Sequence, residues 1–253
     1  MRNKMTMFTP PEIRQIAPEI APHFENCAEA DITRRAEYLA AIQAATPEVG
    51  RRGHRVLHGA MLADTEAEHV RALAGMMDLP QGALVADLGC GIGEVGRLMG
   101  ADRPDLRWVH VNLSEAQIRQ ADGARVVADF HALPLADASV DAVLFLFSLC
   151  HGDLGAALRE AARITRPGGL CFIFDLARLS GDNAASEAAL FARFYAPETM
   201  LGAAAAAGWR PDIVRAPAVR RHVLRELLAD QFDAILSGCR PAIWQFTRCA
   251  NGG

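Results

Sequence analysis

Short apolar runs alternate with helical patterns through the second part of this chain, from Leu79-Pro80 onward. This order predicts an α/β fold, a mostly parallel sheet with helices on both faces, because parallel neighbours need a crossover connection between them. The predicted strands are Leu84–Leu88, Trp108–Val111, Arg125–Ala128, Val140–Phe147, Leu170–Phe174, Trp209–Val214 and Ala242–Arg248. The predicted helices between the earlier strands are Glu94–Met99, Glu115–Ala121 and Leu154–Ile164.

The first part of the chain has a different pattern. Residues 1–78 contain helices and loops, including a helix that Asp64 or Thr65 caps, and no clear strand. We therefore expect a helical N-terminal cap over residues 1–78 and one α/β domain over residues 79–253. Within that domain we also expect a helical region from Asp175 to about Ala207 and a helix near Val223–Leu236.

A glycine turn joins the first predicted strand to the first predicted helix, with the sequence VADLGCGIGE over residues 85–94. Glycines let the backbone approach a ligand without Cβ clashes. The G-x-G-x-x-G spacing from Gly91 to Gly96 also occurs in dinucleotide-binding folds. Those folds need a carboxylate about 20 residues further on to hold the ribose. Val111-Asn112 stands at that place here, so the dinucleotide hypothesis explains fewer residues.

Two carboxylates flank the glycine turn, Asp87 before it and Glu94 directly after it. A carboxylate beside such a loop suits a cationic part of a ligand better than a pyrophosphate. S-adenosylmethionine carries an ammonium, a carboxylate and a sulfonium. Amides of the loop can bind its carboxylate, while Asp87 can bind the ammonium directly or through water.

The turn resembles the first motif of the class I S-adenosylmethionine-dependent methyltransferases, V-x-D-L-G-C-G-x-G. Residues 129–141, DFHALPLADASVD, are similar to that family's segment D-x-x-x-L-P-x-x-D-x-S-x-D, and residues 166–169, RPGG, to its turn into the fifth strand. These motifs cover about residues 83–175 in the family's order. The resemblance implies a Rossmann-like fold with seven strands, the last one antiparallel, and S-adenosyl-L-methionine as the cofactor.

The resemblance also implies which residues bind the cofactor. The loop would contribute Asp87, Gly89, Cys90, Gly91 and Gly93. In the family the first acid of the second motif binds the adenine amino group. That role falls on Asp129, with Phe130 beside it.

The end of the second strand departs from the family's usual pattern. Most members have an acid there that accepts both ribose hydroxyls, whereas this chain has Asn112, followed by Leu113. The segment resembles G-[VL]-[TN]-[LI]-S-x-x-Q of a branch with cyclopropane fatty acid synthases and with sterol and geranyl diphosphate C-methyltransferases. In that branch the glutamine commonly reaches the ribose, a role that falls on Gln117. Ser114 would cap the following helix.

Three residues are candidates for catalysis on the acceptor side. His151 follows the fourth predicted strand, whose carboxyl end faces the ligand crevice of such folds. Tyr195 lies after the fifth strand, where the family often places a lid, and Glu94 lies beside the cofactor loop. Each also has a simpler interpretation: His151 could close the pocket, Tyr195 could pack in the core and Glu94 could be structural.

Charge and cysteine content restrict the other function classes. The formal net charge is −4, which argues against a nucleic-acid binder that works by bulk charge. No run of about 18 apolar residues exists, so we expect no membrane span. The N-terminus has no apolar signal region and the six cysteines form no Cys-x-x-Cys pair, which indicates reduced thiols and a cytoplasmic protein. No metal-ligand spacing occurs, so we expect no metal.

Together these features predict an S-adenosylmethionine-dependent methyltransferase that acts on a small, largely apolar acceptor, in small-molecule biosynthesis. A homo-oligomer is compatible with the sequence. The main alternative acceptor is isopentenyl or geranyl diphosphate, which the arginines of Arg51–Arg55 or Arg220–His222 could hold. A phenol or acid O-methyltransferase also fits the sequence. An alternative of another class is a non-catalytic S-adenosylmethionine-binding protein.

Overall fold

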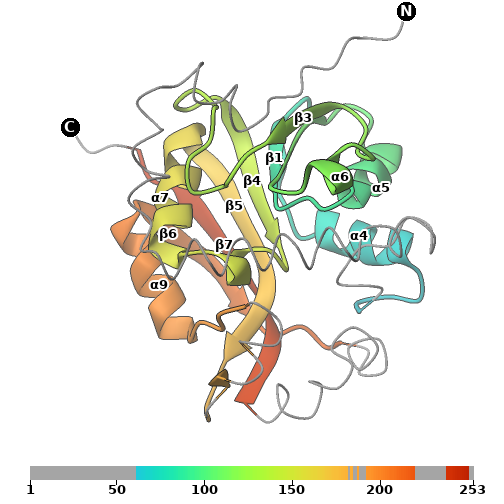
Figure 1. Cartoon of the computed structure of the whole chain (residues 1–253). Helices are drawn as coiled ribbons and strands as arrows, with labels where there is room; N and C mark the ends of the chain where they lie inside the picture. The colour runs from blue at the N-terminus through green and yellow to red at the C-terminus, as the bar shows by residue number, and fades with distance from the viewer. Residues whose placement is uncertain (1–60, 182, 185–186, 188–191, 220–237, 251–253) are drawn as a thin grey trace, which may run out of the picture.

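A seven-stranded sheet forms the centre of the described part of the chain, in the order β3-β2-β1-β4-β5-β7-β6 (Figure 1). The computed structural model describes residues 61–181, 183–184, 187, 192–219 and 238–250. The strands are β1 (Leu84–Leu88), β2 (Arg107–Asn112), β3 (Ala124–Val127), β4 (Val140–Leu146), β5 (Thr165–Arg178), β6 (Trp209–Arg215) and β7 (Cys239–Arg248). Neighbours among β1 to β5 are parallel, and β7 is antiparallel to both β5 and β6. The expected fold is therefore confirmed.

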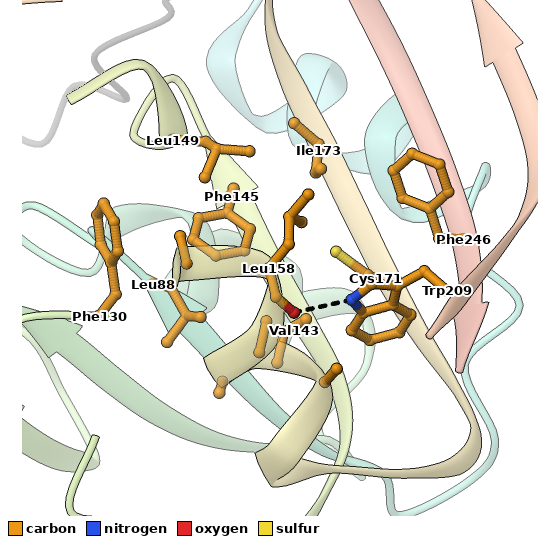
Figure 2. Packing of buried hydrophobic residues seen from close by; sticks show 14 of the residues in the cluster. Leu88, Phe130, Val143, Phe145, Leu149, Leu158, Cys171, Ile173, Trp209 and Phe246 are labelled. Atoms are coloured by element: carbon orange, nitrogen blue, oxygen red, sulfur yellow. Dashed lines mark hydrogen bonds between the residues drawn. The ribbon is translucent and has the colours of Figure 1, made fainter. Parts of the chain in front are cut away.

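Helices cover both faces of this sheet (Figure 1). They are α4 (Glu66–Ala74), α5 (Glu94–Asp102), α6 (Glu115–Ile118), η1 (Leu149–His151), α7 (Leu154–Ile164) and α9 (Pro197–Ala206). Apolar side chains of α4 and α5 pack with one set of strand residues, and those of α7 and α9 pack with the other set. In the second layer the Trp209 indole donates to the Leu158 carbonyl at 3.0 Å (Figure 2). None of the described helices is long and apolar enough to cross a membrane.

Local sequence signals account for where several helices begin. Thr65 and Glu68 form a reciprocal capping box at the start of α4, as the expected Thr65 cap requires. Ser114 accepts from the Gln117 amide at the start of α6, and Asp153 accepts from the Ala156 amide at the start of α7. The Ser114 and Asp153 caps fix the chain direction after β2 and after η1, respectively.

The chain after β4 departs from the expected pattern in two places. Residues 166–169 do not form a separate turn but a bulge within β5, where Val140 pairs with Thr165 and Ala142 with Leu170. The expected helical region from Asp175 is wrong at its start. Residues up to Arg178 stay in β5 because they pair with β7, and α9 begins only at Pro197.

Three expectations fall on residues outside the described ranges. They are the N-terminal part of the cap, the helix near Val223–Leu236 and both arginine clusters. The division at residue 78 stays a prediction. In the described part of the expected cap, α4 packs against α5 and shares its apolar layer.

His69 of α4 is a fully buried histidine within this layer, and its burial makes stability depend on pH. Its Nδ1 accepts from the Leu62 amide at 3.2 Å, and its ring lies 6.0 Å from that of Phe174, centroid to centroid. Burial lowers the pKa of His69 from 6.5 to about 4. Between these values the unfolded chain takes up a proton that the folded chain does not, so the free energy of unfolding falls as the pH decreases.

We therefore expect wild type to lose about 2 kcal/mol more stability than His69→Asn between pH ~7 and pH ~5. Asparagine can still accept from Leu62 but does not titrate. Urea denaturation of both proteins at the two pH values measures the difference. Parallel pH dependence in the two proteins would show that His69 does not resist protonation in the folded state.

Candidate active site

The carboxyl ends of β1 to β4 meet at one edge of the sheet, as parallel strands require. The segments that leave these strands carry the candidate residues. They are the glycine loop after β1, Asn112 at the end of β2, Asp129 after β3 and η1 after β4. The fold therefore brings together residues that lie up to about sixty positions apart in the sequence.

The glycine loop has a backbone that only glycine adopts easily. Gly89, Gly91 and Gly93 have φ values of 82°, 57° and 78°. A Cβ at Gly89 would lie 2.4 Å from the Cβ of Ser148, and one at Gly93 would lie 2.4 Å from that of Ala121. The loop is thus pressed against the segment after β4, where the Ser148 hydroxyl donates to the Leu88 carbonyl at 2.6 Å.

The loop amides are less available to a ligand than the sequence suggested. The amides of Gly89 and Cys90 both donate to the Val111 carbonyl, at 2.9 and 3.0 Å, and the Gly93 amide donates to Cys90. This leaves the amides of Gly91 and Ile92 as the loop groups that can bind an anionic part of a ligand. We expected all the loop amides to be able to bind a ligand carboxylate, but only the amides of Gly91 and Ile92 remain available for it.

Asp87 lies next to the loop, and its side chain is 2% exposed. Among the described residues its Oδ2 has no hydrogen-bond partner, and Nδ1 of His110 lies 3.7 Å from it. A buried carboxylate oxygen without a donor is costly, so it favours a ligand that brings one. An ammonium group, directly or through a water, meets that need.

His110 explains the last glycine of the G-x-G-x-x-G pattern. A Cβ at Gly96 would lie 2.4 Å from Cε1 of His110, whose ring stacks on Trp108. Gly96 is therefore needed to admit a histidine from β2 under α5. The dinucleotide-like spacing results here from packing within the protein.

Asn112 holds the glycine loop from the end of β2. Its Nδ2 donates to the Gly91 carbonyl at 3.2 Å and to Oε1 of Gln117 at 2.9 Å. Gln117 is buried, and the half-buried Leu113 lies next to Asn112 in the chain. The two predicted ribose contacts, Asn112 and Gln117, are thus joined in one network with the loop.

Because of this network, we expect the family's usual acid at position 112 to weaken cofactor binding. A carboxylate cannot donate to Gly91 or to Gln117 and would repel both oxygens. We expect Asn112→Asp, although it introduces the family's usual acid, to bind S-adenosylhomocysteine about 10-fold or more weaker than wild type. Asn112→Ala, which loses the donor without the repulsion, should fall between them in titration calorimetry. Tighter binding by Asn112→Asp would mean that a carboxylate bound to the ribose contributes more to affinity than the hydrogen bond from Asn112 to the loop.

Asp129 and Phe130 follow β3. The Asp129 carboxylate is buried, and its Oδ1 accepts from the His131 amide at 3.0 Å and from the His131 ring. Phe130 packs edge-on against Phe145 in the core, with ring centroids 5.5 Å apart (Figure 2). Asp129 can therefore offer a fixed carboxylate to a ligand, while Phe130 acts first as a core residue.

The predicted catalytic residues lie in different surroundings. His151 is half-buried in η1, and the Tyr195 hydroxyl donates to the neighbouring Gly152 carbonyl at 2.7 Å. Burial raises the pKa of Tyr195. Both carboxylate oxygens of Glu94 accept from the Arg97 guanidinium, which favours a structural ion pair over a base. Catalysis by any of the three stays a prediction.

Asp175, three residues before the end of β5, belongs to none of the sequence motifs but contributes to this edge of the sheet. Its carboxylate accepts from the amides of Cys150 and Leu176, at 3.0 and 2.8 Å, and so holds η1 in place. Burial raises the pKa of Asp175 to about 6. An acid at the end of the apolar run Leu170–Phe174 was the available signal.

Comparisons with known proteins agree with this arrangement. Residues 86–173 match the family model of a methyltransferase domain. The 27-O-demethylrifamycin SV methyltransferase of Amycolatopsis mediterranei is 40% identical over 109 residues, which cover 38% of this chain and 40% of that protein. The chain thus spans about two fifths of the length of the curated relative in this match.

Solved structures of low identity share the fold. The [4+2]-cyclase SpnF has a TM-score of 0.70 at 16% identity, over 89% of this chain and 98% of that chain. The geranyl diphosphate C-methyltransferase from Streptomyces coelicolor A3(2) has a TM-score of 0.65 at 16% identity. That match covers 72% of this chain and 76% of the other.

Proposed function

We propose that this chain, which matches a methyltransferase domain over residues 86–173, transfers a methyl group from S-adenosylmethionine to a small, largely apolar molecule. The observation that carries the proposal is the buried Oδ2 of Asp87, which has no hydrogen-bond partner among the described residues and lies next to a glycine loop. This loop falls within the stretch that matches a methyltransferase domain. The chemistry of an amino-acid-bearing sulfonium cofactor suits that arrangement.

The residues at this edge of the sheet suit each part of the cofactor. Asp87 would hold the ammonium and the amides of Gly91 and Ile92 the carboxylate. Asn112 and Gln117 would meet the ribose, and Asp129 the adenine. When bound, S-adenosylmethionine supplies a methyl group activated on a sulfonium. The protein's part is to bind the cofactor, align the acceptor and exclude water, since in-line transfer depends mainly on positioning.

Residues after β4 would act on the acceptor. His151 lies at the carboxyl end of β4, the side where such folds bind their ligands. Its imidazole would take a proton from an acceptor that must lose one on methylation. Tyr195 holds the adjacent Gly152 carbonyl, so its role would be to fix the turn that carries His151.

The names of the relatives indicate which acceptors this chain would methylate. The relatives' names include methyltransferases of a rifamycin derivative and of malonyl-[acyl-carrier protein], which supports a small-molecule or carrier-bound acceptor. The fold shared with a geranyl diphosphate C-methyltransferase makes a prenyl diphosphate the main specific alternative.

Methyl-deuterated S-adenosylmethionine with a panel of acceptors tests the proposal by mass spectrometry. The panel contains phenols, apolar acids, and isopentenyl and geranyl diphosphate. A labelled product from a neutral acceptor supports the proposed class. A labelled prenyl diphosphate supports the alternative, and the pairs Arg51→Ala/Arg52→Ala and Arg220→Ala/Arg221→Ala would then locate the phosphate end.

A second candidate is a protein that binds the cofactor without methyl transfer. This candidate is supported by the fold that the chain shares with a [4+2]-cyclase, over nearly all of the cyclase chain. Binding of S-adenosylhomocysteine together with no labelled product from any acceptor would support this candidate. A cytoplasmic location belongs to the proposal as well, and the five described cysteines, all free thiols, suit a reducing compartment.

A further inference from the structure

His131 lies between the proposed adenine-binding residue and the start of α7. Its backbone amide donates to Oδ1 of Asp129 at 3.0 Å, and its ring Nδ1 contacts the same oxygen. The His131 side chain is 11% exposed and that of Asp129 is 4% exposed, so this contact is largely shielded from water. Such shielding makes a hydrogen bond to a carboxylate a strong one.

The other ring nitrogen identifies the tautomer of His131. Its Nε2 lies 2.8 Å from the backbone nitrogen of Asp153, and a backbone N–H can only donate. Nε2 therefore carries the lone pair, and in the neutral ring the proton is on Nδ1, which donates to Asp129. The ring thus links Asp129 to the residue that caps α7.

Packing holds the ring in this orientation. A Cβ on Gly152 would lie 2.5 Å from Nε2 of His131 and 2.5 Å from Cε2 of Phe130, so the glycine leaves the space that both rings occupy. The rings of Phe130 and His131 lie 4.6 Å apart, centroid to centroid. The imidazole is therefore confined by a neighbouring ring, a backbone turn and two hydrogen bonds.

The amide and the ring of His131 both donate to Oδ1 of Asp129, which affects how Asp129 recognises a purine. They set the rotation of the Asp129 side chain and stabilise its ionised form. An ionised carboxylate accepts from the exocyclic amino group of adenine and repels the carbonyl oxygen of hypoxanthine.

We infer that His131 is a positioning residue that fixes Asp129 so that the site selects an adenine over a 6-oxopurine. The inference rests on the proposed function, because it assumes that Asp129 meets the purine of the cofactor. The residue that sets purine selectivity is then one that need not touch the purine itself.

Titration calorimetry with S-adenosylhomocysteine and S-inosylhomocysteine tests the inference. Wild type should prefer the adenosyl ligand by well over tenfold, because the wrong purine leaves a buried carboxylate facing an acceptor. His131→Leu, which removes both ring nitrogens, should bind S-adenosylhomocysteine about tenfold weaker and lose most of the preference. His131→Asn places an amide donor near the position of Nδ1 and should retain most of both.

Asp153→Ala is the matched control. It removes the side-chain cap of α7 but leaves the backbone N–H that binds His131. It should lower the melting temperature without changing the preference between the two ligands.

If His131→Leu binds both ligands weaker by the same factor, or keeps wild-type affinity, the inference is overturned. If wild type binds S-inosylhomocysteine as well as S-adenosylhomocysteine, Asp129 does not read the amino group and the inference also fails. Failure of wild type to bind S-adenosylhomocysteine would instead overturn the proposed function.

Discussion

Replacing Gly89 with alanine is expected to lower the free energy of unfolding by about 3 kcal/mol. Alanine at a φ of 82° is strained by roughly 1–2 kcal/mol. Its Cβ would also meet the Cβ of Ser148 at 2.4 Å, so the segment after β4 must move, at a further cost of roughly 1–3 kcal/mol. Because Ser148 precedes η1, the displacement would reach both the cofactor loop and the proposed acceptor side. Urea denaturation measures the loss.

Gly82→Ala separates the two causes. Gly82 has a φ of 73°, yet a Cβ there would meet nothing within 4 Å. It should therefore show the backbone strain alone, roughly 1–2 kcal/mol. Equal losses in the two variants would mean that the loop does not press on Ser148.

Removing either proposed cofactor carboxylate should have the largest effect on binding. Asp87→Ala and Asp129→Ala each lose a charged hydrogen bond of roughly 1.5–3 kcal/mol, so the dissociation constant for S-adenosylhomocysteine should rise about 10- to 150-fold. Asp87 lies on β1 and Asp129 in the segment after β3, and the two carboxylates would contact different parts of the ligand. Their effects in the double variant should therefore be nearly additive.

Asp141→Ala is a control for both variants. The Asp141 carboxylate lies at the start of β4, where it accepts from the Leu84 amide at 2.7 Å and from Arg166. Its loss should lower stability and leave S-adenosylhomocysteine affinity unchanged. A similar loss of affinity in all three variants would point to general destabilisation and not to contacts with the cofactor.

Central strands such as β1 and β4 could be predicted because they are largely apolar runs bounded by turn residues. The expected bounds of β1, Leu84–Leu88, are those of the structure, and α7 likewise spans Leu154–Ile164 as expected. The length of β5 could not be predicted, because residues after Asp175 remain extended only through pairing with β7, far away in the sequence. A local pattern carries no information about that partner.

In the candidate site, too, local motifs predict which residues take part, whereas their contacts depend on segments distant in the sequence. The identities of Asp87, Asn112 and Asp129 as candidates came from motifs. The contacts that define their roles could not be predicted, because they join segments that follow different strands. The Val111 carbonyl takes two loop amides, Asn112 binds Gly91, and the ring of His131 reaches the amide of Asp153. Only the assembled sheet edge brings these groups within hydrogen-bond distance.

Titration calorimetry of the wild-type protein with S-adenosylhomocysteine and with NAD distinguishes a methyltransferase cofactor site from a dinucleotide site. The two ligands share an adenosine, but only S-adenosylhomocysteine brings an ammonium to Asp87, and only NAD brings a pyrophosphate to the glycine loop. We expect saturable binding of S-adenosylhomocysteine and no binding of NAD. Binding of NAD without binding of S-adenosylhomocysteine would contradict it.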